Sequence, residues 1–202
     1  MKERREYVAV LAFLAAIIGI SGCSRQKEEK LTKYDTQFFE LFDTVTSVTG
    51  YARDKKTFQS YVDVFYDELK EYHQLYDIYN DYEGINNIKT INDHAGIEPV
   101  EVDDKIIQML EEAVDIYELT DGNMNVAMGS VLSIWHEYRE AGLKHPEQAQ
   151  LPPQEELEEA AKHMDIRKMV IDPEKKTVYL EDPDMSLDVG AIAKGYAAGM
   201  AS

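Results

Sequence analysis

The sequence predicts an α+β domain in which helices pack on a mostly antiparallel sheet. Apolar residues recur at three- and four-residue spacing over residues 57–75 and 106–117, which indicates two amphipathic helices. Residues 168–171 and 177–180 are short β-rich runs separated by five turn-forming residues, which is typical of a hairpin. The 202 residues, 44% of them hydrophobic, suit one domain with a core of its own.

The N-terminal residues have the form of a bacterial export signal. A basic start over residues 1–5 is followed by an almost wholly apolar run over residues 7–20. This run is shorter than the roughly 20 residues that a membrane-spanning helix needs, and a small-residue site follows it. We therefore expect residues 1–22 to be a signal peptide.

The end of that segment, Ile20-Ser21-Gly22-Cys23, resembles the lipobox of bacterial lipoproteins, in which the cysteine carries acyl chains such as palmitate. Cys23 is the only cysteine of the chain, and lipidation accounts for it without a disulfide or a redox site. The alternative is an uncleaved membrane anchor with a buried thiol. We expect a protein anchored by lipid on the extracytoplasmic face of the cell membrane, with a tether over residues 23–33 and a domain over residues 34–202.

The chain carries a formal net charge of −18. A surface of this sign repels nucleic acid and anionic headgroups, so no nucleic-acid partner is expected. The charge mainly indicates a well-solvated acidic face.

The first elements of the domain follow from local patterns. Residues 43–51 are rich in β-branched residues and alternate, which predicts a strand. The helix over residues 57–75 comes next, and its tyrosines are core residues first and stacking candidates second. Residues 80–96 contain many Asn, Asp and Gly residues, which predicts a loop long enough to be functional or mobile.

The second half of the domain is predicted in the same way. The helix over residues 106–117 has Asp103 or Asp104 as its cap and ends at Gly122. A third helix is expected over residues 126–141 and a short one over residues 152–163. The hairpin follows, then a third short strand over residues 185–189 and a glycine-containing turn into a last helix.

The last helix reaches Ser202 without a cap, a C-terminal charge or a following element. This pattern predicts that the chain is the N-terminal portion of a longer protein, truncated at the C-terminus. The remaining strands of the sheet are then expected beyond Ser202.

The densest chemical signal lies in residues 187–196. A strand ends at Asp188, Gly190 opens a turn, and Lys194 starts a helix. Backbone N–H groups at a helix N-terminus, close approach at a glycine and a nearby ammonium together suit a phosphate group. The alternative is a tight strand-to-helix turn without a ligand. The order of Lys and Gly excludes a P-loop, and two glycines do not make a dinucleotide fingerprint.

No other pattern competes with this one. The five histidines fall at no metal-ligand spacing, and each is interpreted as a surface or capping residue; they are His73, His94, His136, His145 and His163. A Gly-x-Ser-x-Gly elbow is absent from the sequence.

Several blocks of this sequence resemble the ApbE family, the FAD:protein FMN transferases. Asp188-Val-Gly-Ala-Ile-Ala-Lys-Gly-Tyr196 is similar to the family's Asp-Leu-Gly-Gly-Ile-Ala-Lys-Gly-Tyr block. Further blocks agree in order along nearly the whole domain: Phe42-Asp-Thr-Val-Thr, Tyr76-Asp77, Ile88-Lys-Thr-Ile-Asn92, Ala95-Gly96 with Pro99-Val100-Glu-Val102, Thr120-Asp-Gly122 and Leu132-Ser-Ile-Trp135.

The resemblance implies a magnesium-dependent enzyme that cleaves the pyrophosphate of FAD and joins FMN to a Ser or Thr hydroxyl of a flavoprotein, with release of AMP. The acceptors of such flavinylation would be flavoprotein subunits, for example of membrane redox complexes. Two alternatives stay open: an FAD pyrophosphatase that gives FMN and AMP, and a non-catalytic flavin-binding lipoprotein. The fold implied is ApbE-like, resembling a T-fold.

The resemblance also implies roles for single residues. Phe42 and Tyr76 would lie near the flavin or adenine rings, with Tyr79 as the alternative to Tyr76. Asp188 would accept a hydrogen bond from FAD and Lys194 would meet its phosphates. Further contacts are implied for Val126, Ala127 and Met128, and the carbonyl of Ala191 is implied as a magnesium ligand. The family's closing His-x-x-Asp-Pro-x-x-Gly motif is not in these 202 residues, so no catalytic side chain is assigned.

Overall fold

A computed structural model describes residues 30–202. The expected signal peptide and Cys23 lie outside these residues. No helix within residues 30–202 is both long and apolar enough to cross a membrane. The elements in chain order are β1 (Thr32–Phe38), β2 (Thr46–Ala52), α2 (Lys55–Leu75), α3 (Ile88–Asp93), β3 (Val100–Glu101), α4 (Asp104–Leu119), η1 (Val126–Met128), α5 (Gly129–Lys144), η2 (Pro146–Gln148), α6 (Gln154–Ala160), η3 (Ala161–His163), η4 (Ile166–Lys168), β4 (Met169–Asp172), β5 (Thr177–Leu180) and α7 (Ala193–Met200).

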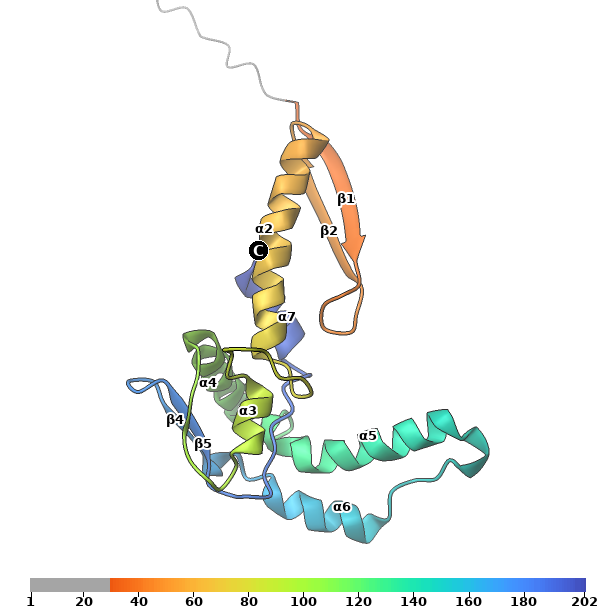
Figure 1. The fold of residues 1–202 in the computed structure, drawn as a ribbon, viewed down its shortest axis with the longest axis vertical. Coiled ribbons are helices and arrows are strands. Elements are labelled where there is room, and N and C mark those ends of the chain that lie inside the picture. The colour runs from red at the N-terminus through yellow and green to blue at the C-terminus, as the bar shows by residue number, and fades with distance from the viewer. Residues whose placement is uncertain (1–29) are drawn as a thin grey trace, which may run out of the picture.

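The first two strands form an arm together with the N-terminal half of α2 (Figure 1). β1 and β2 pair antiparallel, with Thr32 opposite Ala52 and Phe38 opposite Thr46. Their inner face packs on α2 through a small cluster of Ala52, Phe58 and Val62. β1 was not predicted, and the expected tether over residues 23–33 overlaps it at Thr32 and Lys33.

The rest of the described chain is built around a larger core and a three-stranded antiparallel sheet of order β3-β5-β4. The predicted hairpin is confirmed, with Met169 opposite Leu180 and Asp172 opposite Thr177. α3 contacts β5, and α4 contacts β4. Helices packed on antiparallel strands are the predicted α+β class.

The predicted loop over residues 80–96 contains the short helix α3, so that prediction was wrong in part. α3 begins with a capping box: the Asn87 side chain accepts from the Thr90 N–H at 3.0 Å, and the Asn87 N–H donates to Thr90 Oγ1 at 3.2 Å. Asn87 is fully buried. Polar residues therefore start this helix, which a reading of apolar spacing does not detect.

The predicted strand over residues 185–189 is also wrong: within residues 30–202 the segment pairs with no strand. Asn92 takes the place of a neighbouring strand, because its side chain donates to the Leu187 carbonyl at 3.0 Å and accepts from the Leu187 N–H at 2.7 Å. The Ser186 carbonyl accepts from the Gly129 N–H at 2.9 Å. The alternating burial of Met185, Leu187 and Val189 gives the strand-like pattern.

Candidate functional site

A cleft of about 440 Å³ lies between the C-terminal end of α2, the loop after β1 and the start of α7. Four residues implied by the sequence line it: Phe42, Tyr76, Asp188 and Lys194. They come from three separate segments of the chain, so the fold brings together residues that are up to 152 positions apart. This cleft is the candidate site.

One side of the cleft is the turn into α7. The Asp188 N–H donates to the Val126 carbonyl at 2.8 Å, and Asp188 Oδ1 accepts from the Gly190 N–H at 2.9 Å. Lys194 lies in the first turn of α7, is exposed, and forms no ion pair within residues 30–202. A helix N-terminus with an unpaired ammonium beside it suits an anionic group such as a phosphate.

The opposite side begins with Phe42, in the turn between β1 and β2. Phe42 and Asp43 have φ angles of 56° and 50°, a left-handed conformation that is unfavourable for a bulky side chain. The Phe42 N–H donates to His73 Nδ1 at 3.3 Å, and the two rings meet edge to face at 5.4 Å. His73 therefore helps to hold the Phe42 ring at the edge of the cleft.

Tyr76 and Tyr79 lie differently along the same wall. Tyr76 is 4% exposed, and its hydroxyl donates to the Lys105 carbonyl at 3.0 Å. Burial raises the pKa of Tyr76 far above its usual value. Tyr79 is 57% exposed, its ring stacks on His136 at 6.2 Å, and its hydroxyl is hydrogen-bonded to His136 Nδ1 at 2.8 Å. Tyr79 is thus the ring that a ligand can reach.

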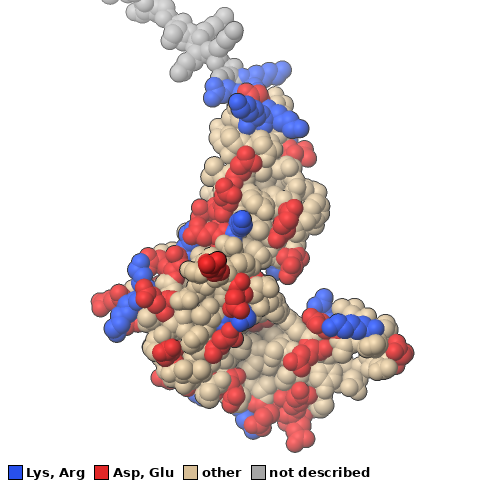
Figure 2. Space-filling view, viewed as in Figure 1, with Lys and Arg blue, Asp and Glu red and all other residues tan. Residues whose placement is uncertain are grey.

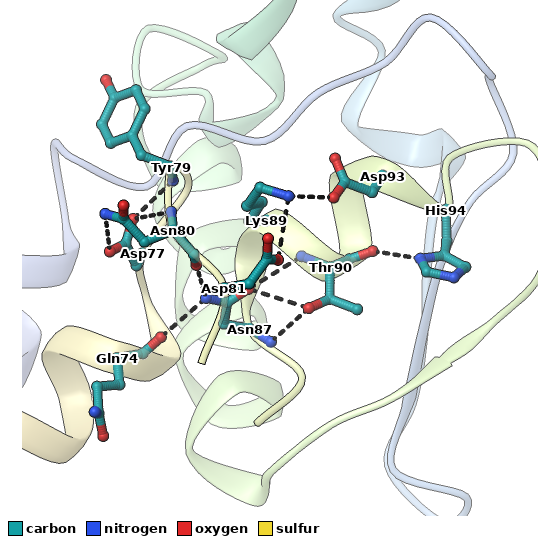
Figure 3. A network of polar contacts seen from close by, with 10 residues as sticks. All are labelled: Gln74, Asp77, Tyr79, Asn80, Asp81, Asn87, Lys89, Thr90, Asp93 and His94. Carbon is teal, nitrogen blue, oxygen red and sulfur yellow. Dashed lines mark hydrogen bonds and ion pairs between the residues drawn. The ribbon is translucent and has the colours of Figure 1, made fainter. Parts of the chain in front are cut away.

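The loop that carries Tyr79 is fixed by a polar network (Figure 3). Asp77 accepts from the Tyr79 N–H at 2.7 Å, from the Asn80 backbone and side chain, and from the Tyr82 hydroxyl. Burial raises the pKa of Asp77, but these hydrogen bonds outweigh it and the net shift is downward. Figure 3 shows the Tyr79 ring pointing away from this network, so the loop is held while the ring stays available.

The remaining implied residues do not line the cleft. Val126 and Ala127 are fully buried and Met128 is half-buried, and Val126 acts on the site through its carbonyl, which accepts from Asp188. Ala191 is exposed and follows Gly190, which does line the cleft. The structure thus places these four residues beneath or beside the site.

A second cavity of about 280 Å³ adjoins the first, and Tyr79, His136 and Asp188 line both. Asn92 and Gly129 also line this second cavity. Sequence patterns did not assign a site role to His136, which lacks a partner at metal-ligand spacing. They did not assign one to Asn92 either, because its role depends on a residue 95 positions away.

Within residues 30–202, one group of three His, Cys, Asp or Glu residues could hold a metal ion. It consists of His163, Asp182 and Asp184, whose ligand atoms lie within 4.8 Å of one another. Asp182 is already paired: Lys168 Nζ lies 2.7 Å from Oδ2 and His163 Nδ1 lies 2.9 Å from Oδ1. The Lys168 ammonium lowers the pKa of Asp182 to about 2. The group therefore acts as an ion-pair link that joins His163 of η3 and Lys168 of η4 to the segment after β5.

Comparison with known proteins agrees with this architecture. The model of the ApbE family matches residues 42–202. An FAD:protein FMN transferase of Chlamydia pneumoniae is 22% identical over 181 residues, which cover 89% of this chain and 52% of the relative. One of Vibrio cholerae is 25% identical over 186 residues, which cover 92% of this chain and 52% of the relative.

Solved structures give the same picture. The ApbE protein of Thermotoga maritima matches with a TM-score of 0.68 and 26% identity, over 84% of this chain and 51% of its own. The flavin transferase ApbE of Vibrio cholerae matches in fold with a TM-score of 0.66 and 19% identity, over 85% and 52%. The chain spans about half the length of the curated relatives it matches. Because the family model covers well over half of its residues, the chain belongs to the ApbE family.

Proposed function

We propose that this chain acts in the transfer of FMN from FAD to a Ser or Thr hydroxyl of a flavoprotein, with release of AMP. One observation carries the proposal: a single cleft joins the start of α7, with Lys194, to the exposed ring of Tyr79 and to Phe42. A flavin dinucleotide has the matching parts, since aromatic rings flank a pyrophosphate. The names of the relatives support the same reaction.

The residues of the cleft have distinct roles in this proposal. Lys194 and the N–H groups at the start of α7 bind the pyrophosphate and withdraw charge from it. Tyr79 stacks on a ring of FAD, and Asp188 accepts a hydrogen bond from it. The acceptor oxygen then bonds to the phosphorus of the FMN part, the bond from that phosphorus to the oxygen of AMP breaks, and the hydroxyl proton is lost to solvent or to AMP.

Magnesium is part of the proposal. This ion prefers oxygen ligands and is commonly held by one or two carboxylates together with substrate phosphates. The carboxylates of Asp43 and Asp188 line the cleft, and the Ala191 carbonyl follows Gly190 in the chain. These donors fit such an ion. When bound, it would withdraw negative charge from the pyrophosphate.

We also propose that the protein is exported and held at the outer face of the cell membrane by acyl chains on Cys23. The lipobox-like Ile20-Ser21-Gly22-Cys23 supports this localisation. Flavoprotein subunits of membrane redox complexes would be acceptors within reach of such an anchor.

A direct test incubates the chain with FAD, magnesium and a Ser/Thr-containing acceptor, followed by mass spectrometry. The mass of FMN on the acceptor is the expected result. Free FMN and AMP without an adduct would instead identify a pyrophosphatase, and FAD binding without either product would identify a flavin-binding protein.

The site itself is tested by FAD affinity. Lys194→Gln is expected to raise the Kd of FAD by about tenfold or more, because a charge-assisted hydrogen bond contributes about 1.5–3 kcal/mol. Lys70→Gln removes an exposed lysine of α2 that does not line the cleft and is expected to leave the Kd unchanged. Equal affinities of the Lys194 variant and the unmodified chain would refute the placement.

A further inference from the structure

The free end of the arm carries a concentration of positive charge on an otherwise acidic chain (Figure 2). We define the basic tip as residues 30–33, which lead into and begin β1, and residues 53–56, which connect β2 to α2 and include the first two residues of that helix. It contains five basic residues and one acidic residue, whereas the rest of the described chain contains 11 basic and 34 acidic residues. The two regions therefore have opposite signs.

The lysines of the tip are available for a partner. Lys30, Lys33, Lys55 and Lys56 are exposed, and none of them forms an ion pair with a carboxylate within residues 30–202. Eight of the lysines and arginines elsewhere in that range do form such pairs. The acidic residue of the tip, Asp54, caps α2 by accepting from the Thr57 N–H at 2.8 Å.

Exposed apolar side chains lie among these lysines. Leu31 is 52% exposed and Tyr51 is 65% exposed. Tyr51 lies directly opposite Lys33 across the hairpin. Because side chains alternate along a strand and Ala52 faces α2, Leu31, Lys33 and Tyr51 share the face that points away from the helix. Lysine beside tyrosine and leucine is the composition of a surface that meets a lipid interface.

We propose that the basic tip docks on anionic lipid headgroups and sets the chain end-on to the membrane. The proposal rests on the proposed anchor, because only six residues lie between Cys23 and Lys30, and the seven steps from one to the other span about 25 Å at full extension. An acylated Cys23 thus keeps the tip within reach of the headgroups. The acidic remainder is repelled by the same surface, so the cleft is turned away from it.

The experiment uses the full chain after export, with the acyl mass on Cys23 verified, in vesicles of phosphatidylcholine alone or with added phosphatidylglycerol. A fluorophore is attached at Thr32→Cys in the tip or at Glu158→Cys on α6, and nitroxide-labelled headgroups act as quenchers. Quenching at the tip probe is expected to be stronger in anionic vesicles and weak at the α6 probe in both. Equal quenching of the tip probe in the two kinds of vesicle would overturn the proposal.

Charge is tested with matched sets of substitutions. The K30Q/K33Q/K55Q/K56Q variant is expected to lose the preference for anionic vesicles, whereas K70Q/R139Q/K144Q/K162Q keeps it. Salt at about 1 M is expected to remove the preference for anionic vesicles too, because the electrostatic screening length falls to about 3 Å. Retained preference in the tip variant, or the same loss in the control set, would refute the assignment.

Failure of the anchor is measured separately. If Cys23 carries no acyl group, the anchor proposal fails, and the tip is tested by sedimentation of the Cys23→Ser chain with the same vesicles. The ratio of anionic to neutral binding is then expected to fall by at least about tenfold in the tip variant. An unchanged ratio would contradict docking by the tip.

Discussion

Asn92 shows how much one side chain contributes to the candidate site. Its amide makes both hydrogen bonds to the Leu187 backbone, which has no other partner within residues 30–202, and the Leu187 side chain is fully buried. Asn92→Ala is therefore expected to lower the free energy of unfolding by about 2–4 kcal/mol, because a buried N–H and C=O lose their partners.

Denaturant unfolding checks this expectation. The matched control is Asn86→Ala, which removes one exposed hydrogen bond to the Glu101 carbonyl and should cost less than about 1 kcal/mol. Equal losses in the two variants would show that the link to Leu187 is dispensable.

Asp182 makes stability depend on pH. Its folded pKa of about 2 lies below the usual value of 3.8, so the stabilisation is fully present above about pH 4 and is lost as the pH falls through about 2. Asp182→Asn is expected to lower the free energy of unfolding by about 1 kcal/mol at pH 7 and to flatten its decline between pH 4 and 2.

Thermal unfolding over a pH series measures the effect. Glu174→Gln changes an exposed carboxylate in the β4–β5 turn and should keep the decline. If the stability of the Asp182 variant falls as steeply between pH 4 and 2 as that of the unmodified chain, other carboxylates cause the pH dependence.

At this scale the sequence predicted part of the site. Phe42, Asp188 and Lys194 lie in the cleft because their local motifs fix the backbone at the turns that carry them. The sequence could not decide whether Tyr76 or Tyr79 is the ring available to a ligand, because the two differ in burial. The Tyr76 hydroxyl points into the core, whereas the Tyr79 hydroxyl is hydrogen-bonded to His136. Contacts of this kind depend on the tertiary structure.

At the scale of elements, α5 approaches the segment after β5 so closely that its first residue has no room for a side chain. A Cβ on Gly129 would lie 2.5 Å from the Ser186 carbonyl oxygen. Gly129→Ala is expected to lower the free energy of unfolding by about 1–3 kcal/mol and to weaken FAD binding, because Ser186 and Asp188 must shift.

Gly199→Ala provides the control for the same substitution in a helix. Apart from the neighbouring backbone of α7, no atom of residues 30–202 lies within 4 Å of its added Cβ, so higher helix propensity should stabilise α7 by up to about 1 kcal/mol. Calorimetry and FAD titration of both variants give the comparison. If both Gly129→Ala and Gly199→Ala raise the free energy of unfolding, α5 and Ser186 are not in tight contact.

The elements differ in how far their sequences predict them. α2 is 21 residues long with a continuous apolar stripe, so its period is evident. α3 has six residues and a polar start, and β1 has the half-polar sequence TKYDTQF, so neither carries a strong periodic signal. Residues 185–189 have the alternating pattern that predicts a strand, but the alternating burial arises there without the hydrogen-bond ladder of a sheet.

At the scale of the molecule, the arm and the larger core are two unequal sources of stability. The arm depends on a two-stranded hairpin and the small cluster of Ala52, Phe58 and Val62. By contrast, α4 buries Ile106, Met109 and Leu110 completely. A two-stranded sheet is marginally stable by itself. We expect the amides of β1 and β2 to exchange with solvent about tenfold or more faster than those of α4.

Hydrogen exchange followed by mass spectrometry resolves the two regions. Phe58→Ala, in the small cluster of the arm, should accelerate exchange in β1 and β2 while leaving α4 unchanged. Acceleration across both regions would mean that the arm and the core unfold as one unit.

The hydrogen bonds between Asn92 and Leu187 affect when the cleft can form during synthesis of the chain. A chain that emerges N-terminus first presents Phe42, Tyr79 and Asn92 well before residues 186–194. The side of the cleft with Phe42 and Tyr79 is therefore synthesised first. The side with Asp188 and Lys194 is complete only after residue 194 has been synthesised. A ligand that needs both sides of the cleft would therefore find no complete site on a partly emerged chain.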